Sequence, residues 1–255
     1  MTLLDGEFKL HGRIMPASNA TFVGEVDGTQ VVYKPIAGER PLWDFPDGTL
    51  AHREVAAYLV SEAMGWDVVP HTFLREGPHG PGMVQVWREP DPEQAAVTIV
   101  AEGSVPEGYR HVFDGVDQHD APISLVHEDS APLRRMAVFD VVVNNADRKG
   151  GHVLEMAYGH RYGVDHGVAF HPDHKLRTVL WGWADEPLAD DEAVGVRRVL
   201  EVLGDALDGP LADELGTLLD QVEVSRLARR CRRLLDDGRF PQPQGDWPAI
   251  PWPPF

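Results

Sequence analysis

Two acidic loops in the middle of the chain carry the residues best suited to chemistry. The first loop, residues 145–152, contains Asp147, and the second, residues 164–167, contains Asp165. One carboxylate can orient the incoming nucleophile while another holds a divalent ion, and phosphoryl transfer needs both functions. The pattern therefore favours a site for a nucleoside triphosphate and its metal ions.

Each charged residue of these loops has a predicted role. Asp147 would accept or orient the proton of an attacking hydroxyl, and Arg148 would balance the local negative charge. Asp165 would bind magnesium, and His152 would supply a second ligand, although imidazole suits manganese better. In the alternative interpretation, the asparagines beside Asp147 only make loop hydrogen bonds, and residues 165–167 form a turn.

Elements of the N-terminal third must position a cation near these loops. Residues 21–26 and 30–35 are β-rich and flank an Asp-Gly turn, which predicts a hairpin with Lys34 near its end. Apolar spacing predicts a helix from Thr49 to Met64, with Thr49 as its cap and Gly65 as its terminator. Residues 68–74 and 82–87 are predicted strands.

Glu54 lies on the helix that follows Lys34. An ion pair between the two side chains would aim the ammonium group at phosphate oxygens. Without the downstream acidic loops, a solvated lysine and an exposed helical glutamate would be the simpler interpretation.

The remaining two thirds of the chain are predicted to be mostly helical. Ser130 caps an apolar helix that leads into the first acidic loop, and residues 190–208 and 210–237 have helical periodicity. Residues 91–129 show no clear pattern. Residues 238–255 contain six prolines and predict an irregular, aromatic tail.

The composition disfavours several classes of protein. The 255 residues include one cysteine, Cys231, so no internal disulfide can form, and no N-terminal apolar run resembles a signal peptide; we expect a cytoplasmic protein. No transmembrane segment is expected, because no run approaches about 20 apolar residues. The net charge of -18 disfavours nucleic-acid partners and anionic lipid surfaces.

Five segments, taken together in this order, resemble the phosphatidylinositol 3-/4-kinase-like superfamily. The closest patterns are those of type II phosphatidylinositol 4-kinases, of HipA-type kinases and of an actinobacterial branch labelled phosphatidylinositol kinase-like. The joint order carries the resemblance, since each piece alone is weak. The segments span roughly residues 20 to 170 and comprise residues 31–35, 54–59, 64–70, 145–148 and 164–170.

This resemblance implies an α+β fold, the two-lobed fold of atypical protein and lipid kinases. A small β-rich nucleotide-binding lobe would span residues 1–88, and a mainly helical catalytic lobe would span residues 89–240. A proline-rich tail, residues 241–255, would follow. ATP would lie between the lobes with Mg²⁺ or Mn²⁺.

The resemblance also implies roles for matching positions. Lys34 would contact phosphate, Glu54 would orient that lysine, and the strand end formed by Gln85, Val86 and Trp87 would offer backbone contacts to adenine. Asp147 takes the catalytic aspartate position, and Asp165 takes the metal-binding one.

Two positions depart from the superfamily pattern. His152 stands where much of the superfamily has asparagine, which affects metal preference and turnover. The nucleotide-covering turn contains no Gly-x-Gly-x-x-Gly, so Ser18 or Asn19 must do by side chain or exposed amide what glycine amides do elsewhere.

The expected function is that of an ATP-dependent phosphotransferase acting on a protein hydroxyl or a small polar acceptor. A nucleotide-binding regulatory pseudokinase and a phosphatidylinositol kinase remain as alternatives; the latter lacks a clear basic surface in residues 171–186. The basic residues of 226–233 favour the solvated face of an amphipathic helix, or a site for an acidic protein partner. Twelve histidines without a metal-binding frame make a zinc hydrolase the weakest alternative.

Overall fold

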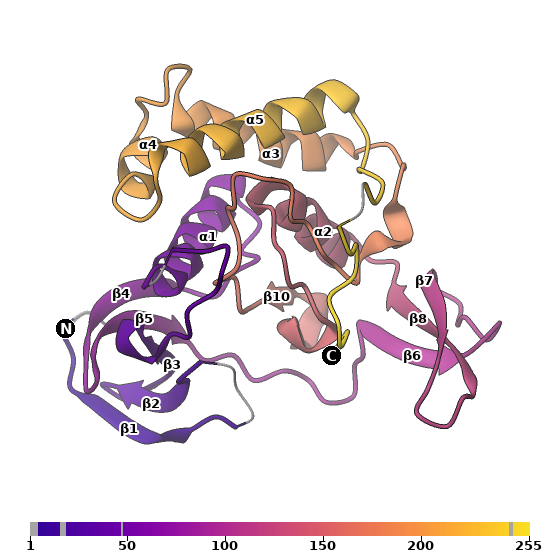
Figure 1. The fold of residues 1–255 in the computed structure, drawn as a ribbon, viewed down its shortest axis with the longest axis horizontal. Coiled ribbons are helices and arrows are strands. Elements are labelled where there is room, and N and C mark those ends of the chain that lie inside the picture. Colours follow the sequence, from indigo (N-terminus) through magenta and orange to yellow (C-terminus); the bar gives the residue numbers. More distant parts are fainter. Residues whose placement is uncertain (1–4, 16–18, 47, 245–246) are drawn as a thin grey trace.

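A computed structural model describes residues 5–15, 19–46, 48–244 and 247–255. A five-stranded antiparallel sheet forms the N-terminal lobe, and the helices of the C-terminal lobe stack in layers above and beside it (Figure 1). The predicted α+β class, with a β-rich N-terminal part and a helical C-terminal part, is confirmed. The strands of the N-terminal sheet, in the order β1-β2-β3-β5-β4, are β1 Phe8–Arg13, β2 Phe22–Val26, β3 Thr29–Pro35, β5 Gly80–Val86 and β4 Thr72–Gly77.

The predicted hairpin is present and brings Lys34 to the end of the central strand. Asp27 and Gly28 have φ values of 47° and 81°, the left-handed geometry that a two-residue turn between twisted strands requires. Strand β4 begins at Thr72, later than expected, and follows Pro70, which has no N–H to donate to a strand partner.

Helix α1, Leu50–Met64, has the predicted length but a different cap. Thr49 makes no capping bond; its hydroxyl donates to the carbonyl oxygen of Pro46 at 2.7 Å. Glu39 instead accepts from the free N–H groups of Leu50 and Ala51, at 3.0 and 2.8 Å. A distant carboxylate thus satisfies donors that the helix leaves unpaired.

A second sheet occupies residues in which the sequence shows no pattern. It lies at the opposite end of the molecule from the first sheet (Figure 1). The C-terminal lobe is therefore less uniformly helical than predicted. In the order β6-β8-β7, its strands are β6 Val97–Ala101, β8 Pro122–Glu128 and β7 Tyr109–Val116.

Helix α2, Ala131–Val143, begins as predicted, with the hydroxyl of Ser130 accepting from Leu133 N–H at 3.4 Å. Two short strands, β9 Val153–Glu155 and β10 Arg161–Gly163, pair after the first acidic loop.

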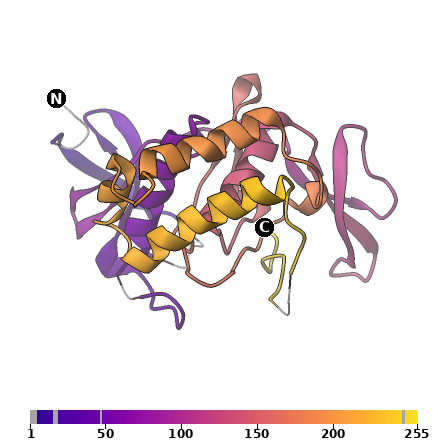
Figure 2. The same ribbon diagram turned by 90° about the horizontal axis from the view of Figure 1, so that it is seen from above.

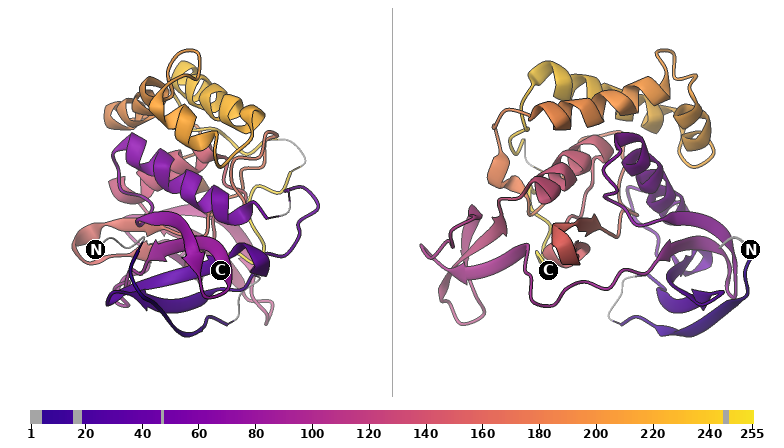
Figure 3. Two further views of the ribbon diagram at one scale, coloured as in Figure 1. Left: turned by 90° about the vertical axis from the view of Figure 1, so that its left-hand side faces the viewer. Right: turned by 180° about the vertical axis from the view of Figure 1, so that it is seen from behind.

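The C-terminal helices form a layer over α1 and α2, and Figure 2 shows α3 and α5 running side by side. The views in Figure 3 show this layer on the far side of α1 from the N-terminal sheet. The range 210–237, predicted from its helical periodicity, forms two helices: residues 216–220 separate them, and Asp220 caps the second by accepting from Glu223 N–H at 2.8 Å. The three helices are α3 Asp190–Leu203, α4 Pro210–Leu215 and α5 Gln221–Asp237.

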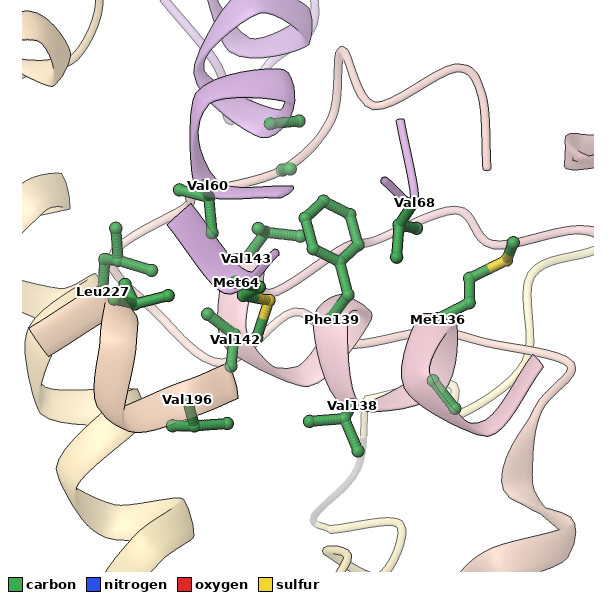
Figure 4. Packing of buried hydrophobic residues seen from close by; sticks show 14 of the residues in the cluster. Val60, Met64, Val68, Met136, Val138, Phe139, Val142, Val143, Val196 and Leu227 are labelled. Carbon is green, nitrogen blue, oxygen red and sulfur yellow. The ribbon is translucent and has the colours of Figure 1, made fainter. Parts of the chain in front are cut away.

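The largest hydrophobic core joins α1 to the C-terminal helices. Val60 and Met64 of α1 lie beside Val142 of α2, Val196 of α3 and Leu227 of α5, and all five are buried (Figure 4). Burial of each such side chain contributes roughly 1.5–3 kcal/mol. Helix α1 is therefore anchored among helices of the C-terminal lobe while its other residues contact the N-terminal sheet.

Within the described ranges, no helix is long and apolar enough to cross a bilayer.

Candidate functional site

A cleft of about 670 Å³ lies where the N-terminal sheet faces the two acidic loops. This volume is in the usual range for small-molecule sites. Lys34, Asp147, His152 and Asp165 all line it. The remaining lining residues are Ile14, Asn19, Thr21, Val32, Pro70, Gln85, Val86, Trp87, Arg88, Glu89, Pro90, Lys149, Gly151, Leu154, Val164 and Phe255.

The predicted ion pair is present, and it extends to a third residue. The Lys34 ammonium lies 2.6 Å from Glu54 Oε1 and 2.8 Å from Asp165 Oδ1. The other Glu54 oxygen accepts from the backbone N–H of His166 at 2.8 Å. Strand β3, helix α1 and the second acidic loop therefore meet at one ammonium group.

This arrangement favours the charged forms of its members. Burial alone would lower the pKa of Lys34, but the carboxylates of Asp165 and Glu54 outweigh it and raise the pKa above the ordinary value. The same ammonium lowers the pKa of Asp165, against the opposing effect of burial. A phosphate group entering the cleft would meet a cation already held in place.

Asp147 is held by the loop that precedes it. Its backbone N–H donates to Asn145 Oδ1 at 3.0 Å, and the amide of that asparagine donates to buried Asp140 at 2.9 Å. Lys149 Nζ and Arg177 Nη2 stand 3.7 and 3.9 Å from the Asp147 carboxylate. Burial nevertheless raises the pKa of Asp147, which suits a group that accepts a proton.

Arg148 lies beneath the cleft instead of lining it. Its guanidinium is fully buried and makes two 2.9 Å bonds to the Asp140 carboxylate. It also donates to the backbone carbonyl oxygens of His152 and Val164, at 2.9 and 3.2 Å. The charge of Arg148 therefore balances that of Asp140 and not that of Asp147. Because its hydrogen bonds join both acidic loops, the geometry gives Arg148 a positioning role.

His152 is oriented as a metal ligand would be. Because the carbonyl oxygen of Asp147 can only accept, the 2.8 Å contact from Nδ1 places a proton on that nitrogen. The other ring nitrogen, Nε2, lies 3.4 Å from Asp165 Oδ2. One imidazole and one carboxylate fit a divalent ion as two of its ligands, and the described residues offer no group of three or more His, Cys, Asp or Glu side chains for one.

The predicted adenine-binding strand end lines the cleft, but its donors are occupied. The N–H groups of Val86 and Trp87 donate to the carbonyl oxygens of His71 and Gln30, both at 2.9 Å. The Gln85 side chain donates to Thr72 at 2.9 Å. These backbone and side-chain donors are therefore not free to contact a ligand.

The turn that was predicted to cover a nucleotide is described only in part. Asn19 lines the cleft, and its side-chain oxygen accepts from Arg40 N–H at 2.8 Å. That bond ties Asn19 to the chain after β3. Ser18 lies outside the described residues.

The sequence interpretation missed two residues at this site. Phe255 reaches the cleft because Pro254 accepts from Gly150 N–H at 2.8 Å, and the ring packs where a Cβ on Gly150 would lie only 2.3 Å from it. No local pattern indicated this contact. Asp140 did leave a signal, since an aspartate within an apolar helix requires a buried partner.

Comparisons with known proteins give one strong relationship. No protein-family model matches the chain. The crystal structure of a Helicobacter pylori proinflammatory kinase, CtkA, shares 12% identity at a TM-score of 0.45, over 91% of this chain and 97% of that one. This likeness is too distant to assign an activity. Protein Rv2133c of Mycobacterium tuberculosis is 48% identical over 266 residues, which cover 99% of this chain and 94% of that protein, and the chain therefore belongs to the family of Protein Rv2133c.

Proposed function

We propose that the protein is an ATP-dependent phosphotransferase that acts on a protein hydroxyl or a small polar acceptor. One observation carries this proposal: Lys34, held by Glu54 and Asp165, faces the same cleft as Asp147. A fixed cation, a carboxylate for a metal ion and a carboxylate for the acceptor are the parts that phosphoryl transfer requires.

The cleft offers separate places for the two ends of a nucleotide. Val32, Val86 and Leu154 supply apolar surface for a flat base, and Lys34 supplies the charge for its phosphates. On binding, the ammonium group would exchange its bond to Asp165 for bonds to phosphate oxygens while keeping its bond to Glu54.

Asp147 would take the proton from the acceptor hydroxyl. The acceptor oxygen forms a bond to the terminal phosphorus, the bond from that phosphorus to the bridging oxygen breaks, and ADP leaves with the electron pair. The raised pKa of Asp147, caused first by its burial, strengthens it as the proton acceptor. Arg148 and Asn145 keep this carboxylate in position through the loop backbone.

Asp165 and His152 would hold the divalent ion. When bound, the ion neutralises phosphate charge. Binding would separate Asp165 from Lys34, so their ion pair describes the ligand-free arrangement.

Transfer from γ-labelled ATP tests the proposal directly. Labelling of acceptors, of the protein itself or of water is measured for the wild type, Asp147→Asn and Asp165→Asn, with magnesium and with manganese. Asp205→Asn is a matched control, because Asp205 is exposed and remote from the cleft lining. We expect transfer in the wild type and the control only. Equal labelling in all four proteins would remove the catalytic assignment.

A regulatory pseudokinase is the second candidate. It is favoured by the short ligand set, since the described residues provide only His152 and Asp165 for a metal ion at this place. Measurements of ATP binding and of phosphate transfer distinguish the two functions. ATP that raises the melting temperature without transfer to any acceptor would favour the pseudokinase, because a ligand selective for the folded state stabilises it.

A further inference from the structure

A second cavity of about 530 Å³ lies in the C-terminal lobe and shares no lining residue with the cleft. Helix α5 forms one side, and residues 239–244 close another. Its lining combines three arginines and several apolar side chains with two carboxylates, those of Asp185 and Asp237, in a chain whose net charge is -18. The lining residues include Val141, Leu176, Arg230, Arg233, Arg239 and Phe240.

Arg230 is the unusual member of this lining. Its Nε donates to the carbonyl oxygen of Val142 at 2.8 Å, but its buried Nη2 has no hydrogen-bond partner. No carboxylate of the described chain forms an ion pair with it. Burial lowers the pKa of Arg230 to about 10, because desolvation of the cation outweighs the attraction of Glu223. Nη2 itself is closed off from solvent, but Arg230 as a whole is only partly buried, so an anion in the cavity would lie against the accessible edge of its guanidinium and supply the missing charge; Nη2 would gain an acceptor when the side chain turns toward that anion.

The two other arginines already have partners. Arg233 lies 3.4 Å from Asp237, and Arg239 lies 3.1 Å from Asp185. Both pairs are exposed at the mouth of the cavity, where ion pairs contribute little and can exchange partners readily. The unbalanced charge is therefore the one in the interior.

Apolar side chains complete the cavity and restrict what fits it. Leu176, Leu234 and Phe240 are buried, and prolines 241 and 243 extend the same wall. A bare inorganic anion would leave these surfaces in contact with water. A ligand with an apolar body would cover them and gain free energy by doing so.

We propose that this cavity binds a small organic anion, with a phosphate or carboxylate head on Arg230 and an apolar body along Leu176, Leu234 and Phe240. Arg233 and Arg239 would turn toward the head from the mouth. This site is independent of the cleft and of phosphoryl transfer.

Three probes test the site by the rise they cause in melting temperature and by titration calorimetry. Phenyl phosphate carries head and body, inorganic phosphate carries the head alone, and benzoate carries a carboxylate head. We expect phenyl phosphate to bind more tightly than inorganic phosphate. Benzoate binding that Arg230→Gln abolishes would show that the head can also be a carboxylate, and benzoate that fails to bind would restrict the head to phosphate.

Matched variants assign the binding to the cavity. Arg230→Gln should weaken phenyl phosphate roughly tenfold or more, the loss expected for one charge-assisted hydrogen bond. Arg232→Gln removes the same charge from an exposed position of α5 outside the cavity and should bind as the wild type does. Lys34→Met disables the cleft and should also leave this binding unchanged.

If Arg230→Gln does not fold, Arg233→Gln serves instead, because it changes only an exposed side chain at the cavity mouth and should weaken binding by a smaller factor. The proposal is overturned if none of the probes binds. It is equally overturned if binding survives in Arg230→Gln and Arg233→Gln, or if Lys34→Met is the variant that loses it.

Discussion

The cleft and the layer beneath it use the same kinds of residue in opposite ways. In the cleft, Lys34 pairs with Asp165, whose side chain is 52% exposed. Beneath it, Arg148 pairs with Asp140, and both side chains are 0% exposed. An exposed pair can exchange partners with a ligand, whereas a buried pair cannot without a large desolvation cost. The buried layer therefore holds the loops, and the exposed groups remain available for binding.

The largest effect should come from breaking the buried layer. Asp140→Ala leaves the Arg148 charge buried and unpaired, and removing one partner of a buried pair costs about 3–5 kcal/mol. Urea denaturation, followed by circular dichroism, measures the loss. Asp147→Ala is the comparison, since the cleft aspartate should change stability by less than about 1 kcal/mol. Similar losses of stability in the two variants would contradict the distinction between the cleft and the buried layer.

For catalytic activity, in contrast to stability, we expect a large effect from the cleft aspartate, Asp147. Asp147→Asn keeps the size of the side chain but cannot accept the acceptor proton, so turnover should fall by about 10²–10⁴-fold. Steady-state transfer from ATP measures this, with unfolding of the same variant as the control for structure. A fully active Asp147→Asn would place the proton acceptor elsewhere.

Acid should weaken the pair between Lys34 and Asp165. Lys34 holds the pKa of folded Asp165 below its ordinary value of 3.8. The group therefore contributes stability above pH 3.8 that is lost as the pH falls further. Unfolding free energy measured from pH 6 downward should decline less steeply in Asp165→Asn than in the wild type. Because the carboxylate is half exposed, solvent screening keeps this effect smaller than that of Asp140→Ala.

The smallest predicted effect concerns the cap of α1, the helix that carries Glu54. Glu39→Ala removes the carboxylate that caps α1, and a lost cap costs about 1 kcal/mol. Thr49→Ala should change stability less, because Thr49 makes no capping bond. Thermal denaturation of both variants measures the difference, and a larger loss in the threonine variant would contradict the assigned cap.

The sequence predicted elements whose signals are local. The Asp27-Gly28 turn, the α1 range and the Ser130 cap depend on neighbouring residues, and all three are present. The proximity of Lys34, Glu54 and Asp165 could also be predicted from the sequence, because their segments occur in a recognisable order.

Features decided by distant contacts could not be predicted in this way. In the second sheet, β6 pairs with β8, which follows it only after β7, and the sequences of these strands lack clear alternation of apolar and polar residues. Arg148 points into the interior and not into the cleft because its side chain bonds to Asp140 and to two carbonyl groups of other segments. Phe255 reaches Gly150 across 105 positions of sequence, 255 minus 150, with only proline and glycine composition as a guide.

The contact between Pro254 and Gly150 also has a consequence for biosynthesis. The first acidic loop emerges from the ribosome long before residues 254 and 255 are made, so it must spend that interval without its final neighbours. Both acidic loops can be fastened by Arg148 during translation, but the cleft wall formed by Phe255 is added only afterwards.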